Sequence, residues 1–122
     1  MTGRRGARSE AFDDDVRRNV LFLRRRDRLV VYVSILEAIR QEMRSRRFAK
    51  FTHVMYRSNM SAMRLKERLQ ELSYLELIEW KEHGVRLTEK GVNFLREVKK
   101  LFRVLEEYGF VVARYDRKRT LF

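Results

Sequence analysis

The clearest hydrophobic pattern in the chain lies in residues 61–73, where leucines recur at helical spacing. Leu65, Leu69 and Leu72 are separated by 4 and 3 residues, which places them on one face of a helix. Ser61 stands where an N-cap residue accepts a hydrogen bond from a free backbone N–H. The pattern therefore predicts a helix that starts at this serine and buries its leucine face.

A shorter helix is predicted over Phe51–Ser58, just before a polar break in the chain. Val54 and Met55 fall on its buried side together with the phenylalanine that begins it. Asn59 can take the left-handed backbone conformation that a sharp turn needs. The two helices and this break predict a helix–turn–helix unit.

A small β-hairpin is predicted directly after the second helix. Apolar and acidic positions alternate over residues 75–80, although Ile78 interrupts the alternation. Lys81–Gly84 is a candidate turn, and Val85–Leu87 is the candidate return strand. A helix–turn–helix followed by a two-stranded hairpin is typical of a winged-helix domain, whose second helix commonly enters a DNA major groove. We expect a mainly helical fold of this class.

Two longer helices flank this unit. Residues 27–46 carry apolar positions near the helical period and would form the first core helix. The last helix is predicted over residues 89–108, between an N-cap at Thr88 and a left-handed stop at Gly109. Its length of roughly 20 residues (~30 Å) exceeds what closing a small winged helix requires.

The last helix carries two apolar stripes, so that one can dock on its own domain and leave the other for a partner. The first stripe steps by 3, 4 and 3 residues, which is coiled-coil spacing. Phe94, Leu101 and Tyr108 form the second stripe, at one flank. We expect a homodimer through this helix, and we assign dimerisation to the first stripe, Leu95, Val98, Phe102 and Leu105.

The winged-helix domain is expected over residues 27–109, and the ends lie outside it. Residues 1–11 are rich in Gly, Ser and Arg, and we expect a disordered basic arm. Residues 12–26 form either an extra helix or, around Val20–Leu23, a short strand. Residues 110–122 are assigned as a basic tail, with a strand or a continuation of the last helix as alternatives.

Composition points to a polyanionic partner. The chain has 122 residues, enough for one domain, and a formal net charge of +12. Such a charge favours nucleic acid as a partner, although a highly charged surface that only keeps the protein soluble would give the same net charge. No apolar run approaches the roughly 20 residues that span a bilayer, so we expect no membrane partner. Absence of cysteine suits a cytoplasmic protein, and 38% charged residues would fit a thermophile.

Nothing in the sequence indicates an enzyme. The only histidines, His53 and His83, lie 30 residues apart with no cysteine nearby, so a zinc site has little support. There is no nucleophile motif and no glycine-rich phosphate loop. We therefore expect no catalytic residues, no metal, no cofactor and no small-molecule ligand.

Residues 52–61, Thr-His-Val-Met-Tyr-Arg-Ser-Asn-Met-Ser, resemble the signature of an archaeal winged-helix DNA-binding family. That family reads roughly Thr-Lys-Ile-Met-Tyr-Lys-Ala-Asn-Leu-Ser across its helix–turn–helix. The Leu77-Ile78-Glu79 and Leu87–Gly91 segments keep the family's order and spacing, so the resemblance covers about residues 29–108. The family includes small basic DNA-binding proteins and virus-encoded relatives, and some members dimerise through an antiparallel coiled coil of the last helix. One departure is Glu76, where the family usually has glycine at the end of the recognition helix.

Candidate DNA contacts follow from this arrangement. The recognition helix would present Ser61, Met63, Arg64, Arg68 and Gln70, because arginine can contact guanine bidentately and a helix N-terminus can hold a phosphate. The wing would present Lys81, His83 and Arg86, and further contacts would come from Arg47, Lys50, His53 and Arg57. The alternative is that Arg64 and Arg68 only pair with Glu67 and Glu71 on a solvated face.

Three functions fit these expectations. The first is a homodimeric, sequence-selective transcription regulator bound to double-stranded DNA in the nucleoid. The second is an architectural protein that coats DNA through phosphate contacts, which the excess of arginine elsewhere in the chain supports. The third is a winged-helix scaffold for protein interactions.

Overall fold

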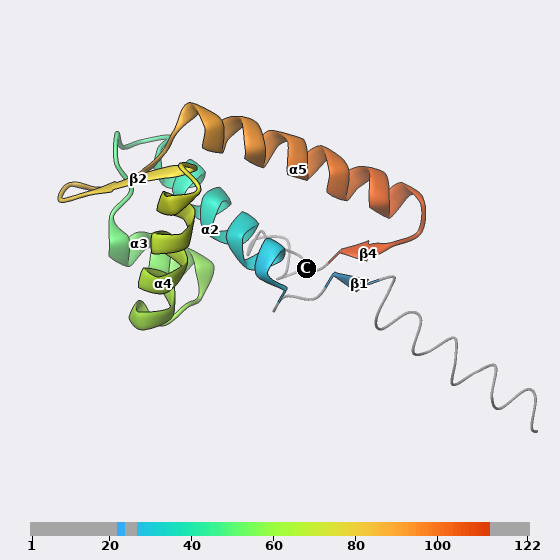
Figure 1. Ribbon diagram of the computed structural model, residues 1–122, viewed down its shortest axis with the longest axis horizontal. Helices are drawn as coiled ribbons and strands as arrows, with labels where there is room; N and C mark the ends of the chain where they lie inside the picture. The colour runs from blue at the N-terminus through green and yellow to red at the C-terminus, as the bar shows by residue number, and fades with distance from the viewer. Residues whose placement is uncertain (1–21, 24–26, 113–122) are drawn as a thin grey trace, which may run out of the picture.

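The structure is a computed structural model and describes residues 22–23 and 27–112. Four helices and two small sheets make up this part of the chain (Figure 1). In chain order the elements are β1 (Phe22–Leu23), α2 (Arg28–Glu42), α3 (Phe51–Ser58), α4 (Ala62–Tyr74), β2 (Ile78–Lys81), β3 (Gly84–Leu87), α5 (Glu89–Glu107) and β4 (Val111–Val112). The expected fold, mainly helical with a small hairpin, is confirmed.

Helix α2 is the centre of the core. Val33, Ile35, Leu36 and Ile39 are all fully buried, although they point in several directions around the helix. A helix that is apolar on most sides must be covered on most sides. In Figure 1 α5 covers one side of α2, while α3 and α4 lie on the other. The two helices of the helix–turn–helix therefore lie on the side of α2 opposite to α5.

The turn between α3 and α4 forms as the sequence predicts. Asn59 has φ 55° and ψ 49°, the left-handed conformation. The backbone N–H of Met60 donates to the carbonyl of Met55 at 3.2 Å, which closes the end of α3. Ser61 then caps α4, because its hydroxyl accepts a hydrogen bond from the backbone N–H of Arg64 at 3.3 Å.

The hairpin β2–β3 is antiparallel and pairs Ile78 with Leu87 and Lys81 with Gly84. A single bridge from Ala49 to Val85 adds a third piece of backbone beside β3. Gly84 is required at this crossing. It has φ 133°, and a Cβ there would lie 2.3 Å from the carbonyl oxygen of Ala49. The hairpin therefore emerges from the helical body at a defined place, as the wing.

Helix α4 ends in a left-handed residue that is not glycine. Glu76 has φ 63°. The backbone N–H of Leu77 donates to the carbonyl of Leu72 at 3.0 Å, and that of Glu76 to the carbonyl of Ser73 at 2.9 Å. This pair of bonds is the Schellman motif, which usually has glycine at the left-handed position. The helix therefore ends where the family pattern has glycine, even though the residue is glutamate.

Helix α5 starts at its predicted cap, where the Thr88 hydroxyl accepts a hydrogen bond from the backbone N–H of Gly91 at 3.0 Å. Gly91 lies against the preceding connection, and a Cβ on it would lie 2.0 Å from the Leu77 carbonyl oxygen. The left-handed stop predicted at Gly109 is present, with φ 96°.

The terminal segments depart from two of the expected assignments. Phe22 and Leu23 form strand β1, which is the strand alternative and not a helix. They pair in parallel with Val111 and Val112, so this part of the expected basic tail is strand β4. Val112 is buried in the core, which explains why an apolar pair follows α5. The other residues of the expected arm and extra helix, and residues 113–122 of the expected tail, lie outside the described part of the chain.

Candidate nucleic-acid interface

The solvent face of α4 is defined by the leucines on its other side. Leu65, Leu69 and Leu72 are fully buried, which leaves Met63 (73% exposed) and Tyr74 (87% exposed) pointing outward. Lys66, Glu67 and Gln70 are exposed on the same side. This outer face of α4 is the surface that a winged helix offers to a major groove. Met63 and Gln70 therefore lie where the sequence predicts.

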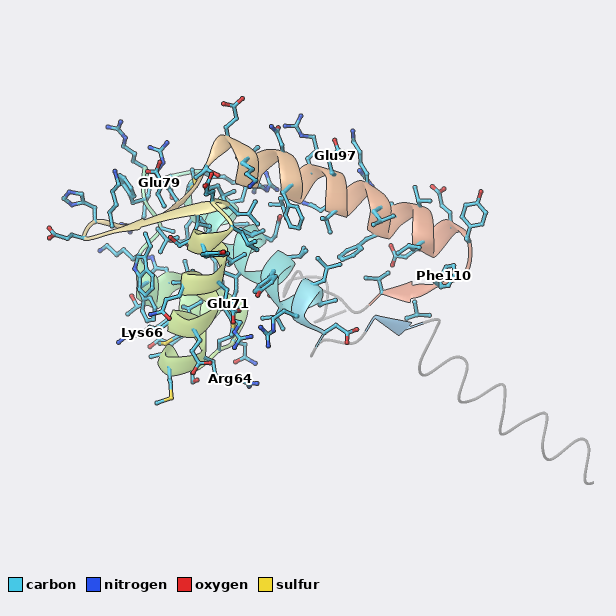
Figure 2. The ribbon with its side chains drawn as sticks, in the orientation of Figure 1. Arg64, Lys66, Glu71, Glu79, Glu97 and Phe110 are labelled. Carbon is cyan, nitrogen blue, oxygen red and sulfur yellow. The ribbon has the colours of Figure 1, made fainter. Side chains whose placement is uncertain are left out.

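Lys66 is a candidate contact that the sequence reasoning missed. Figure 2 shows it on the left of α4, the direction in which the wing also points, while Arg64 and Glu71 lie on other sides. Within the described residues Lys66 and Gln70 form no hydrogen bond or ion pair. The spacing of residues 63, 66 and 70 is the signal that could have revealed it, since these positions share one helix face.

Arg68 lies outside this outer face, contrary to its expected role. Its side chain is only 17% exposed and pairs with Glu67 at 3.2 Å and with Glu71 at 3.4 Å. Glu71 also accepts hydrogen bonds from the Tyr32 hydroxyl at 2.7 Å and from the Arg28 guanidinium at 3.1 Å. The alternative predicted for this residue, pairing with the two glutamates, is the one observed. Arg64 differs, because its exposed side chain has no ion pair among the described residues.

These contacts have an electrostatic consequence for Glu71. The hydrogen bond from Tyr32 lowers the pKa of the Glu71 carboxyl, and the positive charges of Arg68 and Arg28 lower that pKa further, against a smaller opposing effect of burial. The carboxylate is therefore ionised under ordinary conditions and holds its arginine neighbours.

His53 and Arg57 are engaged within the molecule. Arg57 donates to the Glu42 carboxylate at 2.6 Å and to the Gln41 side chain at 2.7 Å, and His53 Nδ1 lies 2.8 Å from Glu42. Burial of Glu42 raises its pKa, but hydrogen bonds from Arg57 and His53 outweigh this and lower the pKa overall. Both side chains join α3 to the end of α2. The structure thus gives both residues a role in packing, and their expected DNA contacts stay a prediction.

The wing places its three predicted contacts differently. Lys81 and His83 are exposed, and the His83 ring lies 6.0 Å from that of Phe48. Arg86 is partly buried with its guanidinium 5.8 Å over the Phe48 ring, and its Nε lies 3.7 Å from Glu79. Arg86 thus packs at the base of the wing, while Lys81 and His83 are exposed near its end, with Lys81 Nζ 3.8 Å from the Glu79 carboxylate.

The connection between α2 and α3 carries the remaining predicted cations. Arg47 and Lys50 are exposed and form no ion pair among the described residues, and the same holds for Arg44. Ser61 is exposed as well, although its hydroxyl is used in capping α4. Exposed cations beside the helix–turn–helix suit phosphate contacts that orient a protein on DNA.

Comparison with known families agrees with this geometry. The family model described as winged helix-turn-helix matches residues 25–106, which is most of the chain. The chain belongs to the winged helix-turn-helix family. No curated protein matches the sequence. Domains of this class bind DNA through the second helix of the motif, which in this protein is α4.

The apolar stripe assigned to dimerisation lies in the core of this winged helix-turn-helix protein. Leu95, Val98 and Phe102 are 1%, 7% and 2% exposed, and Leu105 packs against the same core. The assignment is corrected, because side chains buried by their own domain cannot also contact a partner. In the second stripe Leu101 is 49% and Tyr108 80% exposed, with Val104 beside them at 45%, whereas Phe94 is partly buried against the core.

Two further features are absent from residues 22–23 and 27–112. No group of three or more histidine or acidic side chains there is arranged to hold a metal ion. No helix in that part of the winged helix-turn-helix protein is long and apolar enough to cross a membrane.

Proposed function

We propose that this winged helix-turn-helix protein binds double-stranded DNA as a homodimer and regulates transcription, with α4 in the major groove. The observation that carries the proposal is the outer face of α4. It combines exposed Met63, Lys66 and Gln70, and among the described residues the two polar side chains have no hydrogen-bond or ion-pair partner. A helix that buries one face in the core and presents hydrogen-bonding side chains on the other is suited to reading bases.

The chemistry of the outer face indicates what it would read. Lys66 can donate to guanine O6 and N7, and Gln70 can pair with the N6 and N7 edge of adenine. Met63 offers an apolar contact to a thymine methyl group. Glu67 can accept a hydrogen bond from cytosine N4, and it would repel phosphates that approached the centre of the helix. These features support a regulator with a preferred sequence over a purely coating protein.

Phosphate contacts would come from both sides of the outer face. Arg47 and Lys50 lie on the connection that leads into α3, and Lys81 and His83 lie at the wing. Arg64 projects from the first turns of α4, close to the N-terminal end where backbone N–H groups favour an anion. Contacts of this kind orient the domain and make its binding sensitive to salt.

The exposed stripe on α5 supports a homodimer. Leu101, Val104 and Tyr108 are exposed apolar side chains on one flank of the helix. In an antiparallel pair the exposed stripe of one α5 would pack against the same stripe of the partner helix. Two recognition helices joined in this way can reach successive major grooves about 34–36 Å apart on a two-fold site.

The dimer is tested by Leu101→Glu, with Val92→Glu as the matched control. Val92 is 39% exposed on the same helix but lies outside the stripe. We expect light scattering to show a dimer for the native chain and for the control, and a monomer for Leu101→Glu. If both variants remain dimeric, the contact lies elsewhere on the protein.

DNA binding is tested with a random duplex and with the DNA upstream of the protein's own gene, each at several salt concentrations. Selective, salt-resistant binding to the upstream DNA is the expected result. Lys66→Ala should reduce the preference by about 1–3 kcal/mol, the value of one good base contact. Lys100→Ala removes the same charge from an exposed position on α5 and should leave the preference unchanged.

An architectural role in the nucleoid is the second candidate, and the net charge of +12 favours it. It requires equal binding to the two duplexes with a steep salt dependence. In that case Lys66→Ala and Lys100→Ala would weaken binding by similar amounts. Failure to bind either duplex would refute both DNA roles and leave the scaffold function.

A further inference from the structure

One flank of α4 holds two arginines on a single carboxylate, that of Glu71, and a third arginine lies on the same flank. Arg64 and Arg68 are four residues apart on this helix, and Arg28 reaches it from the start of α2. Glu71 is bonded to Arg68 at 3.4 Å, to Arg28 at 3.1 Å and to the Tyr32 hydroxyl at 2.7 Å. Figure 2 shows Arg64 and Glu71 on the side of α4 that faces away from Lys66. The flank borders the outer face without belonging to it.

The arginines of this flank differ in how free they are. The Arg64 side chain has no ion pair among the described residues. The Arg68 side chain is 17% exposed, because Glu67 and Glu71 both hold it. Four residues of helix correspond to about 6 Å, so an extended Arg68 would lie beside Arg64 along the edge of the groove. Arginine in such a place binds phosphate bidentately and without regard to sequence.

We infer that Glu71 sets the sequence selectivity of this protein by keeping Arg68 and Arg28 off the DNA phosphates. The inference rests on the proposed DNA binding. A phosphate contact strengthens binding to every duplex, whereas a base contact strengthens binding only to the preferred one. Each arginine that stays paired with Glu71 therefore lowers the affinity for non-specific DNA. The base contacts of Lys66 and Gln70 then account for a larger share of the binding to the preferred sequence. Glu71 acts here as a positioning residue, since it works through its partners.

The test compares Glu71→Gln with Glu97→Gln. Both variants raise the net charge by one, and glutamine at position 71 keeps an acceptor for Tyr32. Glu97 is exposed on α5 and forms no ion pair among the described residues, so its variant measures the general effect of charge. Binding to a random duplex and to the upstream duplex is measured between about 50 and 200 mM salt, the range over which counterion release is pronounced.

Glu71→Gln should strengthen binding to the random duplex more than Glu97→Gln does. Its plot of log affinity against log salt should be steeper by about 0.9 for each arginine released. One added contact corresponds to a gain of about 3- to 4-fold in random-duplex affinity on going from the higher to the lower salt concentration. The ratio of upstream to random affinity should fall, and adding Arg68→Ala to Glu71→Gln should restore most of it.

Three results would overturn the inference in distinguishable ways. Equal behaviour of the two glutamine variants means that Glu71 contributes only its charge. A gain that survives Arg68→Ala combined with Arg28→Ala means that other groups make the added phosphate contacts. A loss of thermal stability with parallel weakening on both duplexes means that Glu71 is merely structural. If the native chain binds no duplex, the proposed function and this inference fall together, whereas in the first three cases the proposed function stands.

Discussion

Replacing Glu76 by glycine tests how the recognition helix ends. The residue has φ 63°, in the region that side-chain-bearing residues rarely adopt, and it occupies the left-handed position of the Schellman motif. The side chain is exposed and forms no ion pair among the described residues, so its removal loses no contact seen in the structure. The carbonyl of Glu76 accepts a hydrogen bond from the Thr88 hydroxyl at 2.7 Å, and glycine keeps that carbonyl.

The expected gain follows from two opposing backbone effects. Holding a non-glycine residue in the left-handed region costs about 1–2 kcal/mol. Glycine removes this cost but loses about 0.5–1 kcal/mol more conformational entropy on folding than alanine does. The net expectation for Glu76→Gly is a rise of about 0.5–1 kcal/mol in the free energy of unfolding. For a domain of this size that corresponds to a rise in Tm of about 3–6 °C.

The assay is thermal unfolding of the native chain, Glu76→Gly and Glu76→Ala by circular dichroism, with urea unfolding at one temperature as a check. Alanine removes the same side chain but keeps the backbone strain, so its Tm should lie within about 3 °C of the native value. The reasoning is refuted if glycine gives no higher Tm than alanine. It would then follow that the left-handed conformation at this position carries no measurable strain.

Three further substitutions have definite expected outcomes. Gly91→Ala should lower the free energy of unfolding by about 3 kcal/mol, the upper end for overpacking, measured in urea, because its Cβ would lie 2.0 Å from the Leu77 carbonyl oxygen. Glu42→Gln should cost about 1–3 kcal/mol near neutral pH, where the carboxylate is ionised. The pKa of Glu42 is lowered in the folded protein, so the carboxylate contributes its full stability above the ordinary glutamate pKa. As the pH falls through the folded pKa, the difference in free energy of unfolding between the native chain and the variant should disappear. Urea unfolding at several pH values would detect this. Phe102→Ala should cost about 3–5 kcal/mol in thermal unfolding, because the ring is 2% exposed in the core.

Local signals predicted the elements of this fold well. The turn at Asn59 and the caps at Ser61 and Thr88 are interactions between residues at most four positions apart, so the sequence contains all the information they need. The leucine spacing of α4 likewise identified its buried face. The strand at Phe22–Leu23 was left open because its partner, Val111–Val112, is distant in the sequence.

Charged side chains were harder to assign than apolar ones. Arg57 and Arg68 carry the charge that a phosphate contact needs, but each is held by a glutamate in the folded chain. Glu42, the partner of Arg57, is 15 positions away on another helix. Lys66 was missed because a lysine becomes a candidate DNA contact only when no neighbouring carboxylate pairs with it, and the sequence does not show this. Ion pairing between helices is a property of the packed molecule, and no local pattern reports it.

The sequence by itself determined the class of domain, the position of each helix and the basic character that favours a nucleic-acid partner. The end of the first core helix was predicted wrongly, because α2 ends at Glu42 and not at residue 46. Periodicity and capping act over one or two helical turns, and net charge is a sum over residues, so none of them requires knowledge of the packing. Only the tertiary structure decided which stripe of α5 is buried, since Leu95 and Leu101 are equally apolar and differ in what lies opposite them. The same holds for the cations available to DNA, because burial and pairing depend on segments that meet only when the chain has folded.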